Sequence, residues 1–231
     1  MGGYNDRSTL SRVDKFLAGV TAKPVSRGNL VFALDATASR ERTWDTAAQL
    51  QVQMFREVAV IGSLDVQLVY FRGMTGVNAE CKASGWVGDP MALAKLMAKI
   101  RCETGYTQIE RVLSHASRET TQRKINALVF VGDACEEKRD QLVAAARDLA
   151  HLEIPVFMFQ EGNDQTARLR FQEIAELTHG AYHRFDQGSA KQLAELLKAV
   201  ASFAVGGVVA LEAQGSSAAR LLLSQVGGNE G

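Results

Sequence analysis

The hydrophobic positions of the chain follow two patterns in turn, one typical of buried strands and the other of helices. Short runs that are apolar almost throughout predict strands covered on both faces, because a half-exposed strand would alternate apolar and polar residues. Such runs occur at 29–35, 65–73, 126–133 and 154–160, with weaker ones at 80–88 and 181–185. Between them, apolar residues recur at a spacing of three or four, which predicts amphipathic helices. These helices are expected at 43–62, 89–100, 109–116, 142–150, 171–178 and 193–203.

The alternation of strands and helices predicts the fold class. Parallel strands that are joined by helices form a doubly wound α/β sheet with helices on both of its faces. The connection between 65–73 and 80–88 is too short for a parallel crossover, which needs a dozen or more residues. We therefore expect a mostly parallel central sheet of about six strands with one antiparallel edge strand.

Length and local composition divide the chain into one domain and two extensions. The 231 residues suffice for one sizeable α/β domain, which we place at 28–205. Residues 1–27 contain an apolar stripe at helical spacing and are expected to form an N-terminal helical extension. Residues 206–231 are a tail rich in Gly, Ala and Ser, in which the segment SSAARLLLSQV can form one further helix.

Composition and charge argue against several classes of function. Lys plus Arg and Asp plus Glu both number 26, and no cluster of basic and aromatic residues favours nucleic-acid binding. The apolar segment FAVGGVVALEA is too short to span a membrane and contains Glu212, and the N-terminus has no signal-peptide pattern. The three cysteines are an odd number and widely spaced, which fits a reducing compartment. We therefore expect a cytoplasmic protein that binds neither nucleic acid nor membranes.

Asp35, Thr37 and Ser39 stand at alternate positions where the first predicted strand ends. In an extended segment, side chains two residues apart point to the same side, so these three can meet just beyond the sheet. Their carboxylate and hydroxyl oxygens suit a hard cation such as Mg²⁺ or Mn²⁺. The same residues could instead form a turn, in which Asp35 accepts backbone amides and the hydroxyls cap the next helix. Taken alone, the pattern leaves both interpretations open.

Two further segments end in residues of the same chemistry. Thr107 follows a glycine loop in GYTQIERVL, at the start of a predicted helix, and Asp133 ends the strand run NALVFVGD. A carboxylate that is taken out of water needs a partner, so Asp133 points to a ligand or an ion pair. Ligands of doubly wound sheets bind beyond the carboxyl ends of the strands, where Asp35 and Asp133 are both expected.

Together these segments resemble the metal-ion-dependent adhesion site of the von Willebrand factor type A domain. That family has Asp-x-Ser-x-Ser after its first strand, a threonine in a later loop and an aspartate after its fourth strand. LVFALDATAS, GYTQIERVL and ALVFVGD are similar to these three segments, and FQEIAELTHGAYHRFD is similar to the part that closes the fold. The resemblance covers roughly 28–205. It implies that a divalent cation is held by Asp35, Thr37, Ser39, Thr107 and Asp133.

The resemblance implies binding rather than catalysis. In the family, hydroxyl groups contact the metal directly and the aspartates act largely through water, so the charge of the cation is only partly compensated. An acidic side chain of a partner protein then completes the coordination shell. We accordingly expect Mg²⁺ or Mn²⁺ as the cofactor and a protein partner that presents Asp or Glu. The resemblance also implies a bacterial-type intracellular domain, whose relatives work beside ATPases or in stress-response systems.

The sequence departs from the family pattern at several positions near the site. Thr37 replaces the usual serine and Tyr106 replaces a glycine, and neither change removes a ligand oxygen. Arg40, Tyr106 and Glu136 are expected on the rim, where a partner would bind. Glu136 and Glu137 are also expected to begin the next helix, because the helix dipole favours acidic residues in a first turn.

Two other functions stay open on the sequence. Haloacid-dehalogenase-like phosphatases also place an aspartate after the first strand, so Asp35 would be a nucleophile and Asp133 and Glu137 would bind Mg²⁺. Their mechanism requires an acid two residues after the nucleophile, where this chain has Thr37. The other alternative is a metal-free scaffold of the same fold, which would bind its partners through other surfaces.

Overall fold

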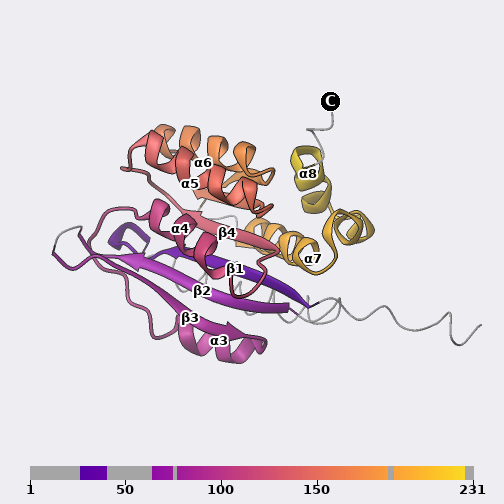
Figure 1. Cartoon of the computed structure of the whole chain (residues 1–231), viewed down its shortest axis with the longest axis horizontal. Helices are drawn as coiled ribbons and strands as arrows, with labels where there is room; N and C mark the ends of the chain where they lie inside the picture. Colours follow the sequence, from indigo (N-terminus) through magenta and orange to yellow (C-terminus); the bar gives the residue numbers. More distant parts are fainter. Residues whose placement is uncertain (1–26, 41–63, 75–76, 187–189, 227–231) are drawn as a thin grey trace, which may run out of the picture.

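The computed structural model describes residues 27–40, 64–74, 77–186 and 190–226 of the chain (Figure 1). The predicted helix at 43–62 lies outside these residues, as does the predicted N-terminal extension apart from its last residue. Within the described residues, strands and helices alternate along the chain as the hydrophobic pattern predicts.

Six strands form one mixed sheet. They are β1 (Gly28–Asp35), β2 (Leu64–Arg72), β3 (Glu80–Val87), β4 (Ala127–Gly132), β5 (Val156–Glu161) and β6 (Ala181–Phe185). Their order across the sheet is β3-β2-β1-β4-β5-β6, and every neighbouring pair is parallel except β2 and β3. The predicted doubly wound, mostly parallel sheet with one antiparallel edge strand is therefore confirmed.

Among the described residues, six α-helices cover the two faces of the sheet (Figure 1). They are α3 (Pro90–Met97), α4 (Ile109–Glu119), α5 (Arg139–His151), α6 (Gln165–Leu177), α7 (Ala190–Gln214) and α8 (Ser217–Val226). α4, α5 and α6 pack on one face of the sheet, and α3, α7 and α8 pack on the other. The described residues also include a short 3₁₀ turn, η1 (Ala38–Arg40), directly after β1.

β1 illustrates why the strands are apolar almost throughout. Leu30, Phe32 and Leu34 pack into the core beneath α7, whereas Val31 and Ala33 pack into the core beneath α4 and α5. All five side chains are at most 1% exposed, and burying a side chain of the size of Leu or Phe stabilises the fold by about 1.5–3 kcal/mol. Because helices cover both faces of the sheet, β1 lies in the centre of the molecule. Its neighbours are β2 and β4, so its carboxyl end lies between these two strands.

The C-terminal part of the chain packs against the domain. α7 is interrupted by a kink at Gly206 and Gly207, where Gly207 has a φ of 64° that only glycine adopts readily. Beyond the kink, Leu211 and Leu222 are fully buried in the same core as β1. α8 also reaches β6, where Oε1 of Gln225 accepts the backbone N–H of Tyr182 at 2.9 Å. Residues 206–226 of the predicted tail thus form two helical segments that pack on the core.

α7 is also long and apolar enough to cross a membrane when judged by length and composition alone. The most apolar 18-residue stretch of Lys191–Gln214 has a mean hydropathy of 1.7, and 44% of that stretch is buried inside the domain. Its contacts with β1, β2 and β4 explain this apolar character, since a helix that packs on a sheet core needs an apolar face.

Candidate metal centre

The end of β1 brings Asp35, Thr37 and Ser39 together. Oδ1 of Asp35 accepts the backbone N–H of Thr37 at 2.8 Å, and Oγ1 of Thr37 lies 3.0 Å from Oγ of Ser39. Asp35 and Thr37 are buried, whereas Ser39 is exposed in the 3₁₀ turn η1. The turn and the grouping of oxygens are therefore both present. The turn itself aligns the two hydroxyl groups on one side of the chain.

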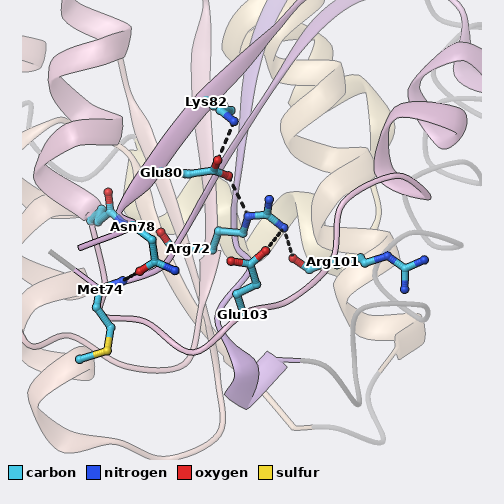
Figure 2. Close-up of polar contacts among 8 residues, drawn as sticks. Arg72, Met74, Asn78, Glu80, Lys82, Arg101 and Glu103 are labelled. Atoms are coloured by element: carbon cyan, nitrogen blue, oxygen red, sulfur yellow. Dashed lines mark hydrogen bonds and ion pairs between the residues drawn. The ribbon is translucent and has the colours of Figure 1, made fainter. Parts of the chain in front are cut away.

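Arg72, at the end of β2, fastens the neighbouring loop to the sheet (Figure 2). Its Nη1 donates to the carbonyl of Arg101 at 2.8 Å and lies 2.9 Å from Oε1 of Glu103. Its Nε lies 2.9 Å from Oε2 of Glu80, whose other oxygen binds Lys82 at 2.7 Å. One guanidinium group therefore holds β3 and the loop that follows α3 in fixed positions beside the end of β1.

The loop then crosses the carboxyl ends of β1 and β2. The N–H of Glu103 donates to the carbonyl of Ala36 at 3.0 Å, and Thr37 and Glu103 form an isolated parallel bridge. The N–H of Tyr106 donates to the carbonyl of Gly73 at 3.3 Å. These backbone contacts bring the segment that bears Thr107 next to the segment that bears Asp35 and Thr37.

Gly105 permits the close approach of the loop to β2. A Cβ atom at this position would lie 2.5 Å from the backbone nitrogen and oxygen of Gly73, which is too close for any side chain. Gln108 secures the same crossing, because its Nε2 donates to the carbonyl of Arg72 at 2.9 Å. Thr107, between these two anchors, is buried with 6% of its surface exposed.

Asp133 follows β4, the other neighbour of β1. A Cβ atom on Gly132 would lie 3.6 Å from Cβ of Asp35, so the ends of the two strands lie side by side. Oδ1 of Asp133 is buried and has no hydrogen-bond partner among the described residues. A buried carboxylate oxygen without a partner is costly, and a cation or a bound water would satisfy it. Asp133 thus fits the role of a metal ligand or of a ligand to metal-bound water.

Glu136, which is predicted only to lie on the rim or to begin a helix, contacts Thr107 directly. Its Oε2 accepts both the backbone N–H of Thr107, at 3.0 Å, and the hydroxyl of Thr107, at 2.7 Å. The N–H of Glu136 in turn donates to Oγ1 of Thr107 at 3.2 Å. No sequence pattern indicates this contact, because the two residues are 29 positions apart and lie in different loops.

The prediction that Glu136 and Glu137 begin the next helix is wrong, since α5 begins at Arg139. Glu137 instead caps α4. Its two carboxylate oxygens accept the N–H groups of Ile109 at 2.6 Å and Glu110 at 2.9 Å. These amides belong to the first turn of α4 and have no acceptor within that helix. Burial raises the pKa of the Glu137 carboxyl above its ordinary value, although the two amide hydrogen bonds oppose this.

The remaining rim residues have different surroundings. Tyr106 has 49% of its surface exposed beside Thr107 and is available to a partner. The backbone of Arg40 belongs to η1, and its side chain lies outside the described part of the structure. Cys135, which follows Asp133 by two residues, is buried, and burial raises the pKa of its thiol to about 11.

The ends of β1 and β4 and the loop before α4 bear carboxylate and hydroxyl oxygens, and the chemistry of these oxygens determines what the site can bind. Among the described residues, no group of three or more His, Cys, Asp or Glu side chains could hold a metal ion. A cation at this site would therefore need the hydroxyl groups as ligands beside the carboxylates. Such a set of hard oxygen ligands suits Mg²⁺ or Mn²⁺ better than a soft metal. The predicted metal ligands lie on neighbouring segments, and their coordination of a cation stays a prediction.

Comparisons with known proteins identify the fold. The chain matches no family profile and no curated protein sequence. Its structure is similar to that of an aerotolerance-related membrane protein from Bacteroides fragilis, with a TM-score of 0.53 and 20% identity over 72% of this chain and 98% of that one. It is also similar to the VWA domain of SpRpn10, with a TM-score of 0.57 and 7% identity over 72% and 94% of the two chains.

A third similar structure contains an occupied metal site. Proximal thread matrix protein 1 from the mussel byssus, solved with a zinc-occupied MIDAS motif, has a TM-score of 0.58 and 12% identity over 77% of this chain and 46% of that one. At these identities the comparisons establish the fold and not the ligand.

Proposed function

We propose that this chain, whose fold is that of the von Willebrand factor type A domain, is a protein-interaction module that binds its partner through a divalent cation. The observation that supports this best is the buried Oδ1 of Asp133, which lacks a hydrogen-bond partner among the described residues. Asp133 follows β4, and the end of β4 lies beside Asp35 at the end of β1. A bound cation would offset the cost of burying these carboxylates.

The residues that would hold the cation are Asp35, Thr37, Ser39, Thr107 and Asp133. When bound, Mg²⁺ or Mn²⁺ would supply an electrophilic centre for a carboxylate. Neutral hydroxyl ligands leave more of the cation's charge uncompensated than carboxylates would, so the site would favour a partner that presents Asp or Glu. Tyr106, half exposed beside Thr107, would contact the partner next to that acidic residue.

The fold and the resemblance also suggest the setting in which the module acts. We infer a cytoplasmic, bacterial-type protein that works with an ATPase or a stress-response component, without catalytic activity of its own. Cys81 and Cys135 are free thiols, which fits a reducing compartment. The phosphatase alternative receives no support at Thr37, whose hydroxyl lies against Ser39 and cannot replace a carboxylic acid as the proton donor.

Calorimetric titration with Mn²⁺ tests the proposal. We expect the wild-type chain to bind one cation, and Asp133→Asn to weaken binding by about 10- to 100-fold, as is typical when a group that orients a metal site is replaced. Asp140→Asn, an exposed change in the first turn of α5, is the matched control and should leave the affinity unchanged. A wild-type chain that takes up no cation would refute the proposal.

The same variants test the interaction itself. Partners captured from a cell lysate in Mg²⁺ should be lost in EDTA and in Asp133→Asn, and retained by Asp140→Asn. A set of partners that neither treatment changes would instead favour the metal-free scaffold. Hydrolysis of an aryl phosphate in Mg²⁺, abolished in Asp35→Asn, would favour the phosphatase.

A further inference from the structure

The hydroxyl group of Thr107 makes two hydrogen bonds with Glu136, and the Glu137 carboxyl also interacts with the Thr107 side chain. A threonine hydroxyl has one hydrogen to donate and two lone pairs to accept with. The hydrogen is donated to Oε2 of Glu136 at 2.7 Å, and one lone pair accepts the N–H of Glu136 at 3.2 Å. One lone pair of Oγ1 therefore remains for a further ligand.

The direction of the donated bond determines what that further ligand can be. A free hydroxyl group rotates and can present either its hydrogen or a lone pair to its surroundings. With the hydrogen held by a carboxylate, Oγ1 of Thr107 can only accept or coordinate. Donation to an ionised oxygen is also a strong hydrogen bond, and it increases the negative charge on Oγ1. Both effects suit an oxygen that binds a cation.

Glu136 and the loop around it are held by contacts other than the one with the Thr107 hydroxyl. Glu137 binds two amides at the start of α4, and Oε2 of Glu136 binds the amide of Thr107 itself. The loop after β4 is thus bound to the amide of Thr107 and to two amides in the first turn of α4. Although Glu136 is exposed, its Oε2 accepts both the amide and the hydroxyl of Thr107, so the contact is formed without a bound ligand.

We propose that Glu136 is a positioning residue of the metal site, which holds the Thr107 hydroxyl as an oxygen that only accepts and thereby raises its affinity for a divalent cation. This inference rests on the proposed metal-binding function, and it assigns to Glu136 a role other than contact with the partner. Groups that orient metal ligands in this way commonly change metal affinity by about 10- to 100-fold.

A double-mutant cycle measured by calorimetric titration with Mn²⁺ tests the inference. Glu136→Ala should weaken binding by about 10- to 100-fold, and Glu136→Gln, which keeps an acceptor oxygen, should restore most of that loss. In a Thr107→Val background, which keeps the shape and removes the hydroxyl, Glu136→Ala should cause no further loss. Asp140→Ala removes an exposed negative charge from the first turn of α5 and should bind like the wild type.

The outcomes separate this inference from the proposed function. Wild-type affinity in Glu136→Ala would overturn the inference and leave the metal site standing. Equal losses with and without the Thr107 hydroxyl would also overturn it, because Glu136 would then act through its charge alone. If the wild type binds no Mn²⁺, the proposed function fails and the inference fails with it. Thermal unfolding of each variant without metal confirms that the proteins compared are folded.

Discussion

Gly132, at the end of β4, occupies a position with no space for a side chain. A Cβ atom there would lie 2.8 Å from Cε1 of Phe130. That ring cannot move aside, because Phe71 stacks on it with a centroid distance of 5.9 Å and Phe171 meets it edge-on at 5.4 Å. The end of β4 therefore has no side chain at position 132, and Asp35 lies directly beside the backbone there.

Gly132→Ala should accordingly destabilise the protein by about 1–3 kcal/mol, the usual cost of overpacking a filled core. Gly85→Ala is the matched control, since a Cβ atom at Gly85 would meet nothing within 4 Å and should change stability by less than about 1 kcal/mol. Urea denaturation of the three proteins measures both effects. Equal stability of the two variants would contradict the packing argument.

His115 should make stability dependent on pH. Burial lowers the pKa of this imidazole below its ordinary value of 6.5, and Nε2 lies 2.8 Å from Oε1 of Gln67. Because the unfolded chain binds the proton more readily than the folded one, stability is present above about pH 6.5 and is lost as the pH falls through the folded pKa. The pKa of His183 is also lowered by burial and contributes with the same sign.

The free energy of unfolding should therefore be smaller at about pH 5.5 than at about pH 7.5. His115→Gln, which is neutral at both values, should show a smaller difference, with a remainder from His183 and other groups. Chemical denaturation at the two pH values checks this. An unchanged difference in the variant would show that His115 does not contribute.

Individual residues of the candidate site could be predicted only where they lie close together in the sequence. Asp35, Thr37 and Ser39 were accessible because alternate positions beyond a strand share a side, and the structure brings the two hydroxyls to 3.0 Å. The sequence predicts Glu136 on the rim and at the start of a helix but does not predict its bond to Thr107, because no local pattern shows that these two loops lie close together. Arg72 was missed for the same reason, since its partners lie on β3 and in the loop after α3.

Among the elements, α8 is the one whose contribution was least evident from the sequence. Its alanines and serines lie in a stretch of low complexity, yet Ala218, Ala219 and Leu222 are buried against the core. Strands were predicted far better. The runs 29–35 and 80–88 correspond to Gly28–Asp35 and Glu80–Val87, because strand-like apolar runs between turn residues stand out in the sequence.

Two adjacent leucines of α8 test whether this helix is part of the cooperative unit. Leu222 is fully buried, so Leu222→Ala should cost about 2–5 kcal/mol, as large-to-small core substitutions do. Leu221 is 37% exposed, and Leu221→Ala should cost less than about 1 kcal/mol. The two midpoints of urea denaturation provide the comparison. Equal small effects would mean that α8 contributes little to the stability of the domain.

At the scale of the whole molecule, the class of fold was predictable and the strand order was not. Alternating strands and helices imply a parallel sheet with helices on both faces, and the short connection between β2 and β3 implies their antiparallel pairing. The order β3-β2-β1-β4-β5-β6 depends on the side of the existing sheet to which each crossover adds the next strand. That side is determined by packing between distant segments, which the hydrophobic pattern of one segment does not contain.

The two borders of the sheet also differ in what they offer to another chain. At β6, Gln225 of α8 already accepts the Tyr182 amide that a neighbouring strand would use. At β3, no strand among the described residues pairs with the outward side. Backbone pairing through one border can join two copies around a twofold axis, but it cannot continue into a filament, which would need a second open border on every copy. Gln225 of α8 therefore occupies a backbone amide that a strand added at the β6 border would need, and no described strand occupies the β3 border.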